Sequence, residues 1–162
     1  MSTFVSVGNA TQPFRRLLDG VLAISRDLPQ PVFVQSGSTP FHAEVCESVP
    51  FLNMNEFQSQ VCRSKLLIMH AGAGSLITAV RAGKVPVVMA RRACYGEHVD
   101  DHQVEFAREL DRAGRIVVAN EPVDLLSAVR EALARQQDAP SIAPVPAMIG
   151  MIADVLHSYA NR

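Results

Sequence analysis

Apolar and polar residues along the chain form two alternating kinds of segment. Short apolar runs without polar alternation occur at residues 4–7, 31–37, 65–70, 85–90 and 115–118. Apolar residues at three- and four-residue spacing mark the segments that follow most of these runs, at residues 17–22, 76–80, 100–113 and 124–136. Uninterrupted apolar strands separated by helices are typical of a parallel sheet covered on both faces. The pattern therefore predicts an α/β fold built on a doubly wound parallel sheet.

The pattern changes near residue 136. Prolines interrupt residues 137–146, and a helical spacing of apolar residues returns over 147–160. Because proline lacks the amide that a helix interior needs, the first of these segments is predicted to be a linker. We therefore predict one domain over residues 1–136, which is long enough for a hydrophobic core. Residues 137–162 are predicted to form a linker and a terminal helix that packs across the domain or onto a partner.

Four loops follow the predicted strands, at residues 8–12, 35–40, 70–75 and 90–99. The carboxyl ends of parallel strands lie at one edge of a sheet, and open α/β sheets bind their ligands there. These loops are therefore predicted to share one rim and to form the binding site.

The segment HAGAGSLITAVRAGKVPVV, residues 70–88, places a glycine-rich turn between a strand and a helix. Its GAGS turn suits dinucleotide, phosphate and nucleotide-sugar sites, although glycine also permits tight strand-to-helix packing. No GK[ST] follows, and Ile77 stands where a dinucleotide fingerprint needs a third glycine. What remains is a helix start at which Gly74 and Ser75 offer amides and a hydroxyl to an anion. At the strand end, His70 either donates to a phosphate or supports the turn.

Composition narrows the class of protein. The formal net charge is −1, with 48% hydrophobic and 19% charged residues, which is ordinary for a globular protein and lacks the basic excess of a duplex binder. We therefore expect no nucleic-acid partner. The three cysteines show no paired spacing, and no apolar run approaches the roughly 20 residues of a membrane span. We expect a cytoplasmic protein whose contact with a membrane comes through a partner.

The segment RRACYGEHVDDHQVE, residues 91–105, concentrates charged residues and two histidines. Its simplest interpretation is a solvated loop before a helix. His98 and His102 have the spacing of zinc ligands on a helix. Capping by Asp100 or Asp101 would, however, start the helix after His98 and remove the shared face, so we expect no metal. A Ser-His-Asp triad has no GxSxG turn to support it.

Three segments together resemble the carboxyl-terminal domain of family 28 glycosyltransferases. They are VSVGNATQPFRRLL, VFVQSGS and, most specifically, HAGAGSLITAVRAGKVPVVMARRACYGEHVDDHQVEFARELDRAG, and the resemblance spans about residues 3–120. Within the family, the chain looks most like the short subfamily of the eukaryotic Alg13 subunit and bacterial exopolysaccharide subunits of the PssE type.

The resemblance implies a Rossmann-like domain that is the donor-binding half of a GT-B transferase. A membrane-associated, Alg14-like subunit would then supply the acceptor half. The implied reaction is inverting transfer from a UDP-sugar to a lipid-linked saccharide in polysaccharide or glycan biosynthesis, with no tightly bound cofactor. The implied location is the inner face of the membrane, and the apolar partner surface could form a homodimer in isolation.

The resemblance also predicts the residues of the donor site. They are Gly8, Asn9, Gln35, Gly37, Leu52, Met54, His70, Gly72, Ala73, Gly74, Ser75, Thr78, Glu97, His98, His102 and Gln103. His70 and Ser75 would stabilise charge on the departing diphosphate, and the base for the acceptor hydroxyl would lie on the partner. Two positions depart from the family: Thr78 replaces a glutamate that grips the ribose, and Arg15 replaces an acidic residue.

Two other functions are compatible with the sequence. One is a scaffold that binds a nucleotide sugar, or none, and activates a partner transferase without contributing to its site; the change at Thr78 motivates this alternative. The other is a stand-alone α/β enzyme such as an epimerase or a small hydrolase, against which the missing second half of the fold and the missing nucleophile turn both argue.

Overall fold

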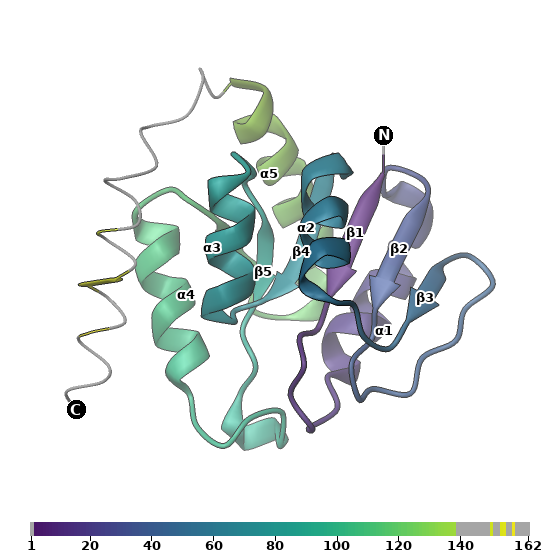
Figure 1. Cartoon of the computed structure of the whole chain (residues 1–162), viewed down its shortest axis with the longest axis horizontal. Coiled ribbons are helices and arrows are strands. Elements are labelled where there is room, and N and C mark those ends of the chain that lie inside the picture. Colours follow the sequence, from purple (N-terminus) through teal and green to yellow (C-terminus); the bar gives the residue numbers. More distant parts are fainter. Residues whose placement is uncertain (1, 139–149, 151–152, 155–156, 158–162) are drawn as a thin grey trace.

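A six-stranded, entirely parallel sheet forms the centre of the molecule (Figure 1). The computed structural model describes residues 2–138, 150, 153–154 and 157. Its strands are β1 (Thr3–Ser6), β2 (Val32–Gln35), β3 (Glu47–Val49), β4 (Leu66–His70), β5 (Val87–Met89) and β6 (Val117–Val118). Their order in the sheet is β3-β2-β1-β4-β5-β6. The predicted doubly wound parallel sheet is confirmed.

Helices cover both faces of this sheet. The α-helices are α1 (Arg15–Ala23), α2 (Met54–Arg63), α3 (Ala73–Arg81), α4 (His102–Arg112) and α5 (Leu125–Asp138), with short 3-10 turns η1 (Ser25–Asp27), η2 (Ala93–Tyr95) and η3 (Pro122–Asp124). Buried residues of α1 and α5 belong to one hydrophobic cluster, and those of α2, α3 and α4 belong to a second. The sheet therefore separates two cores.

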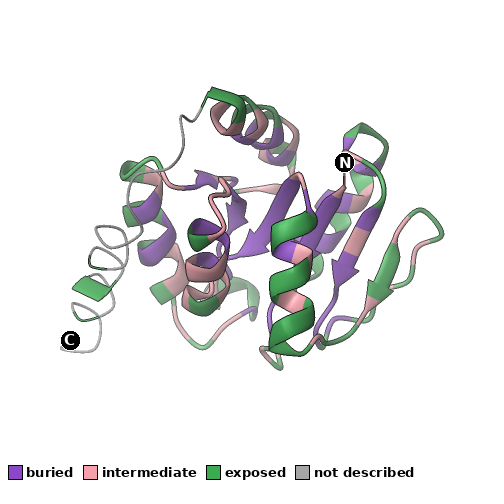
Figure 2. Ribbon diagram, turned by 45° about the horizontal axis from the view of Figure 1, so that its top comes forward, coloured by how far each residue is buried: buried purple, intermediate pink, exposed green. Residues whose placement is uncertain are grey.

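The central strands explain why the apolar runs lack alternation. Along β4, Leu66 and Ile68 contribute to the first core, whereas Leu67 and Met69 contribute to the second. Every residue of β4 is buried, as Figure 2 shows for the middle of the sheet. A strand that packs helices on both faces needs apolar side chains at successive positions, which produces a continuous run.

The chain changes direction in the middle of the sheet, between β1 and β4. From β1 the chain moves outward to β2 and β3, and from β4 it moves the other way to β5 and β6. The loops that leave the carboxyl ends of β1 and β4 therefore diverge, and a crevice opens between them. This crevice is where the fold places a ligand.

Two elements have no counterpart in the sequence-based prediction. The edge strand β3 is short and largely exposed, and α2 buries only Val61 fully, so neither element has an apolar run or a wide apolar face. Helix α4 begins at His102 with Asp101 as its N-cap residue, which agrees with the predicted start. The predicted terminal helix at 147–160 lies almost entirely outside the described residues.

Candidate functional site

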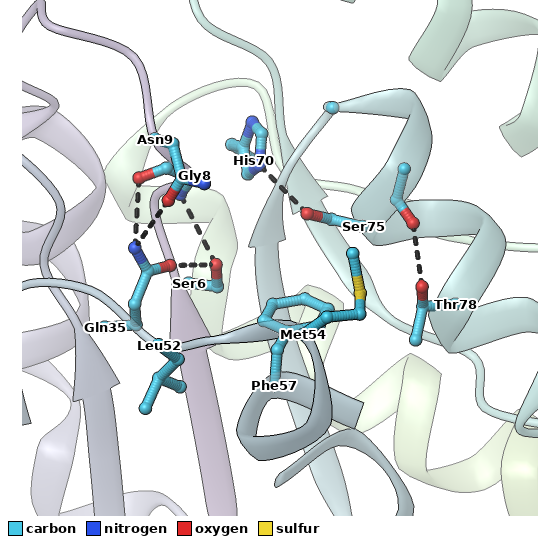
Figure 3. A pocket seen from close by; sticks show the side chains of 12 residues that line it. Ser6, Gly8, Asn9, Gln35, Leu52, Met54, Phe57, His70, Ser75 and Thr78 are labelled. Atoms are coloured by element: carbon cyan, nitrogen blue, oxygen red, sulfur yellow. Dashed lines mark hydrogen bonds between the residues drawn. The ribbon is translucent and has the colours of Figure 1, made fainter. Parts of the chain in front are cut away.

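A pocket of about 360 Å³ lies at the carboxyl ends of β1, β2 and β4, in the crevice where the chain changes direction (Figure 3). It is lined by Ser6, Gly8, Asn9, Gln35, Leu52, Met54, Phe57, His70, Gly72, Gly74, Ser75 and Thr78. Most of the residues predicted from the sequence therefore meet in one cavity. Ser6 and Phe57 are additional.

The imidazole of His70 fills the space between two glycines. A Cβ added to Gly8 or to Gly72 would overlap the ring of His70. Gly8 also has a φ of +78°, a left-handed conformation that side chains other than glycine rarely adopt. A Cβ on Gly37, at φ +57°, would meet the carbonyl oxygen of Gly8. These glycines bring three loops close together around the ring.

Hydrogen bonds define the state of this ring. The side-chain oxygen of Gln103 accepts from the backbone amide of Arg91 (3.3 Å), so its nitrogen faces Nδ1 of His70 at 3.5 Å and donates to it. Nδ1 is then the acceptor, and Nε2 carries the hydrogen that points to Oγ of Ser75, 3.2 Å away (Figure 3). The Nε2–H of His70 therefore donates to Ser75 at the pocket wall, which leaves the hydroxyl hydrogen of Ser75 for a ligand.

The imidazole stays neutral at physiological pH. Burial is the main cause that lowers the pKa of His70 to about 3, and the charges of Arg91 and His98 act in the same direction. A ring that is protonated only in strong acid contributes a dipole and a donor, but no formal charge, to a bound anion.

The start of α3 supplies further donors. Its N-cap residue is Gly72, which has no side chain to occupy the first-turn amides. These amides have no partners within the helix, and they give its N-terminus a partial positive charge. Space is open beside Gly74, where an added Cβ would have no neighbour within 4 Å. The arrangement suits a phosphate oxygen.

A buried amide holds the opposite wall. Gln35 accepts from the Ser6 hydroxyl at 2.6 Å and donates to the carbonyl oxygens of Gly8 and Pro50, each at 3.1 Å. It also lies 3.4 Å from the side-chain oxygen of Asn9. One side chain thus fixes the loop after β1 against the loop that follows β3.

The third wall is apolar and belongs to α2 and the loop before it. Leu52, Met54 and Phe57 line it, and Met54 is 72% exposed. A capping box between Asn53 and Glu56 fixes the start of α2 and therefore the placement of this wall. A flat, uncharged ring is the kind of group that such a wall fits.

Thr78 lies on α3 at the far end of the pocket. Its hydroxyl donates to the carbonyl oxygen of Gly74 at 2.9 Å, one turn earlier in the same helix. Only its acceptor lone pairs remain for a ligand, whereas a carboxylate could accept from two hydroxyls at once.

Six predicted site residues do not line the pocket: Gly37, Ala73, Glu97, His98, His102 and Gln103. Gly37 and Gln103 support residues that do, and Ala73 is the first residue of α3. Glu97 is buried and forms a two-pronged ion pair with Arg16, with both contacts at 2.9 Å. Its oxygens are thus already occupied within the protein.

His98, in the loop before α4, and His102, the first residue of α4, share one carboxylate. Nδ1 of His98 lies 3.1 Å from one oxygen of Asp100, and Nδ1 of His102 lies 3.2 Å from the other. The backbone amide of His102 and the charges of both histidines lower the pKa of Asp100. Among the described residues, no group of three or more His, Cys, Asp or Glu side chains could hold a metal ion.

Ser6 and Phe57 could not be recognised as pocket residues in advance. Ser6 belongs to β1, in which every residue is buried. The sequence of this strand therefore shows no alternation of polar and apolar residues that would identify the side chain facing the pocket. Phe57 lies on α2, and the helix itself was not predicted. The spacing of Asn53 and Glu56 is the signal that would have located this helix.

The solved structures that superpose on this chain include glycosyltransferases. The calicheamicin glycosyltransferase CalG4 superposes with a TM-score of 0.63 at 18% identity, over 96% of this chain and 39% of that protein. A glycotransferase of kitacinnamycin gives a TM-score of 0.57 at 16% identity, over 95% and 37% of the two chains. The six-stranded parallel sheet corresponds to the carboxyl-terminal half of a GT-B glycosyltransferase.

Sequence comparison places the chain within a family. The model of the glycosyltransferase family 28 C-terminal domain matches residues 2–144, and the chain belongs to this family. It is 34% identical over 84 residues to the UDP-N-acetylglucosamine transferase subunit ALG13 of Yarrowia lipolytica, covering 51% of this chain and 41% of the relative. The same subunit of Cryptococcus neoformans is 36% identical over 67 residues, covering 41% and 32%. The matches span less than half of each relative's length.

Among the residues that the structure describes, none of the helices has the length and apolar character needed to cross a bilayer.

Proposed function

We propose that this chain is the donor-binding subunit of a two-component inverting glycosyltransferase, and that a UDP-sugar binds in the pocket between β1 and β4. The observation that carries the proposal is the uncapped first turn of α3, which faces a pocket that is also lined by the hydrogen-bonded pair His70 and Ser75. Family membership and the similarity to ALG13 subunits support a UDP-sugar as the donor.

The pocket residues suit the departure of a diphosphate. In inverting transfer, an acceptor oxygen forms a bond to the anomeric carbon while the bond from that carbon to the diphosphate breaks. The electron pair of the broken bond then goes to the leaving UDP. Amide dipoles, His70 and Ser75 bind the diphosphate most strongly when this charge has developed, so they stabilise the transition state more than the ground state.

The acceptor side of the reaction belongs, in this proposal, to a second subunit. We propose a membrane-associated, Alg14-like partner that binds a lipid-linked saccharide and supplies the base for its hydroxyl, with the pair acting at the cytoplasmic face of a membrane. The pathway would be polysaccharide or glycan biosynthesis. The ALG13 relatives are subunits of a UDP-N-acetylglucosamine transferase by name, which supports an assembly of this kind.

Calorimetric titration of UDP onto the purified chain tests the donor site. The wild-type chain should bind UDP saturably, and His70→Ala should weaken binding by about tenfold, since the imidazole that orients the Ser75 hydroxyl towards the diphosphate is lost. His42→Ala is the matched control, because His42 is exposed and outside the pocket. Equal affinity in the His70→Ala and wild-type chains would contradict the proposed site.

A scaffolding role is the alternative that Thr78 motivates. It predicts that His70→Ala and Ser75→Ala leave transferase activity intact in the chain assembled with its partner. Loss of that activity in both variants, with the assembly preserved, would establish that this chain provides part of the site.

A further inference from the structure

In the proposed function the pocket has to bind an anion, yet the described residues that line it are uncharged. Its polar side chains belong to Ser6, Asn9, Gln35, His70, Ser75 and Thr78, and the imidazole among them is neutral at physiological pH. A diphosphate carries at least two negative charges near neutral pH. Dipoles alone can bind it, but a positive charge in a medium of low dielectric would add a large attraction.

Arg91 is a fully buried cation directly behind the pocket. Its side chain donates to the carbonyl oxygens of Val7 (2.6 Å), Gln12 (2.8 Å) and Glu97 (3.0 Å). Its guanidinium also lies over the ring of Phe14, 4.7 Å from the centroid. These contacts are to neutral groups, and Nε has no hydrogen-bond partner among the described residues.

The carboxylates around Arg91 are paired with other cations. Both oxygens of Glu97 accept from Arg16, and one also accepts from the backbone amide of Arg92 at 3.0 Å. The Arg92 side chain pairs with Glu121 at 2.8 Å. These three arginines and two glutamates leave one positive charge in excess, and Arg91 is the arginine without a carboxylate partner.

Other charged groups near this cluster offset its charge only weakly. Asp100 pairs with His98 and His102, and Asp101 accepts from the backbone amide of Ala93. Asp101 is exposed and Asp100 is half-exposed, so water screens their charges.

The guanidinium is close enough to act on the pocket. Its shortest hydrogen bond is to the carbonyl oxygen of Val7, the residue before Gly8, and the backbone of Gly8 abuts the ring of His70. After burial, the charge of Arg91 is the largest cause of the lowered pKa of His70. Burial lowers the pKa of Arg91 itself only to about 10, so it remains charged at neutral pH.

We propose that Arg91 supplies the positive charge for the diphosphate of a bound nucleotide from behind the pocket wall, without touching the ligand. The inference rests on the proposed function, since it requires a nucleoside diphosphate in this pocket. A buried charge is screened little by solvent, so its attraction reaches across the loop. The same charge would favour departure of the diphosphate, on which negative charge builds up.

The test compares ligands that share a nucleoside but differ in charge. UDP, UMP and uridine are titrated onto the wild-type chain, Arg91→Met and Arg91→Lys, and circular dichroism verifies that each variant is folded. Arg91→Met should lower the affinity for UDP by about tenfold or more and the affinity for UMP by a smaller factor. The affinity for uridine should fall by under about threefold, because the charge acts only on the phosphates. Arg91→Lys, which keeps the charge but loses the planar fork, should restore most of the preference for UDP over uridine. Arg108→Met, at an exposed position, is the control and should change none of the affinities.

Glu97→Gln provides a second test if Arg91→Met does not fold. It keeps the shape of the side chain and removes one negative charge from the cluster, so the preference for UDP over uridine should increase several-fold. An equal loss for all three ligands in Arg91→Met, or an unchanged preference in Glu97→Gln, would overturn the role of Arg91 and leave the donor site standing. A folded wild-type chain that binds no UDP, alone or with its partner, would overturn the proposed function and this inference together.

Discussion

At the scale of single residues, the site depends on close packing around one imidazole. His70 ends β4, and its ring occupies space that exists only because Gly8 and Gly72 lack side chains. Burial keeps this ring neutral, and its neighbours Gln103 and Ser75 select the tautomer. The glycines of the turn therefore serve two purposes, because some make room for the imidazole and others leave space for a ligand.

Gly72→Ala and Gly74→Ala should have opposite effects on stability. A Cβ at Gly72 would overlap His70, so this variant should lower the free energy of unfolding by about 1–3 kcal/mol. Gly74 lies within α3 beside open space. Alanine at this position should raise the free energy of unfolding by about 0.5–1 kcal/mol, because alanine has a higher helix propensity than glycine. Urea denaturation measures both values.

A double-mutant cycle identifies the cause of the effect at Gly72. If overlap with the ring is responsible, Gly72→Ala should cost much less in a His70→Ala background than in the wild type. The same cost in both backgrounds would show that the backbone at Gly72, and not the imidazole, requires glycine.

At the scale of elements, the least apolar helix forms the wall where a base would bind. Helix α2 has a single fully buried residue, so its position depends on its N-terminal cap and on Phe57, which packs edge-to-face with Phe4 at 5.5 Å between centroids. Its capping box satisfies two backbone amides that would otherwise lack partners. A change in the cap should therefore reach the pocket.

Asn53→Ala should lower the free energy of unfolding by about 1 kcal/mol, because the side-chain oxygen that accepts from the amide of Glu56 is lost. It should also weaken UDP binding, since Met54 and Phe57 lie within the first turn of α2. Asn55→Ala is the control. Asn55 is exposed on the same helix, so this substitution should change the free energy of unfolding little. Similar losses of stability in the two variants would show that the cap does not hold α2.

The sequence predicts elements well where burial imposes a pattern. Strands packed between two layers of helices are mostly apolar on both faces, which makes β1, β2, β4 and β5 recognisable. By contrast, β3 is an exposed edge, and α2 packs through few side chains, so selection for apolar residues is weak in both. Strand β3 and helix α2 belong to the connection that takes the chain from β2 back to β4. Such a connection is required by the topology of the sheet and leaves no local pattern in the sequence.

The residues of the candidate site also fall into those that the sequence predicts and those that only the structure shows. Glycines with required conformations and a histidine at a strand end can be predicted, because their chemistry is visible one residue at a time. The ion pair that occupies Glu97 and the hydrogen bonds of Gln35 depend on residues far away in the sequence, such as Arg16 and Ser6. Long-range partners of this kind become visible only in the folded structure.

At the scale of the whole molecule, a buried neutral histidine makes folding sensitive to acid. In an unfolded chain a histidine titrates near 6.5, whereas the pKa of His70 in the folded protein is about 3. Between these values the unfolded state binds the additional proton. The contribution of His70 to stability is therefore complete above pH 6.5 and is lost progressively as the pH falls towards 3.

Denaturant unfolding at pH 7.5 and pH 5.0 tests this linkage. The wild-type chain should lose about 1–2 kcal/mol more stability over this interval than His70→Gln, in which the titrating ring is absent. His42→Gln should behave like the wild type, since His42 is exposed. Parallel losses in the wild type and His70→Gln would mean that the imidazole titrates alike in both states.

The described sheet ends in two very short strands. One edge is β3, with three residues that include Glu47, and the other is β6, with two residues. Unpaired backbone at a sheet edge is a template for intermolecular strand addition, and short edges that carry charge offer little of it. Both edges of the described sheet therefore offer few backbone groups to a strand of another chain, and association through helices or the loop rim is favoured over a shared sheet.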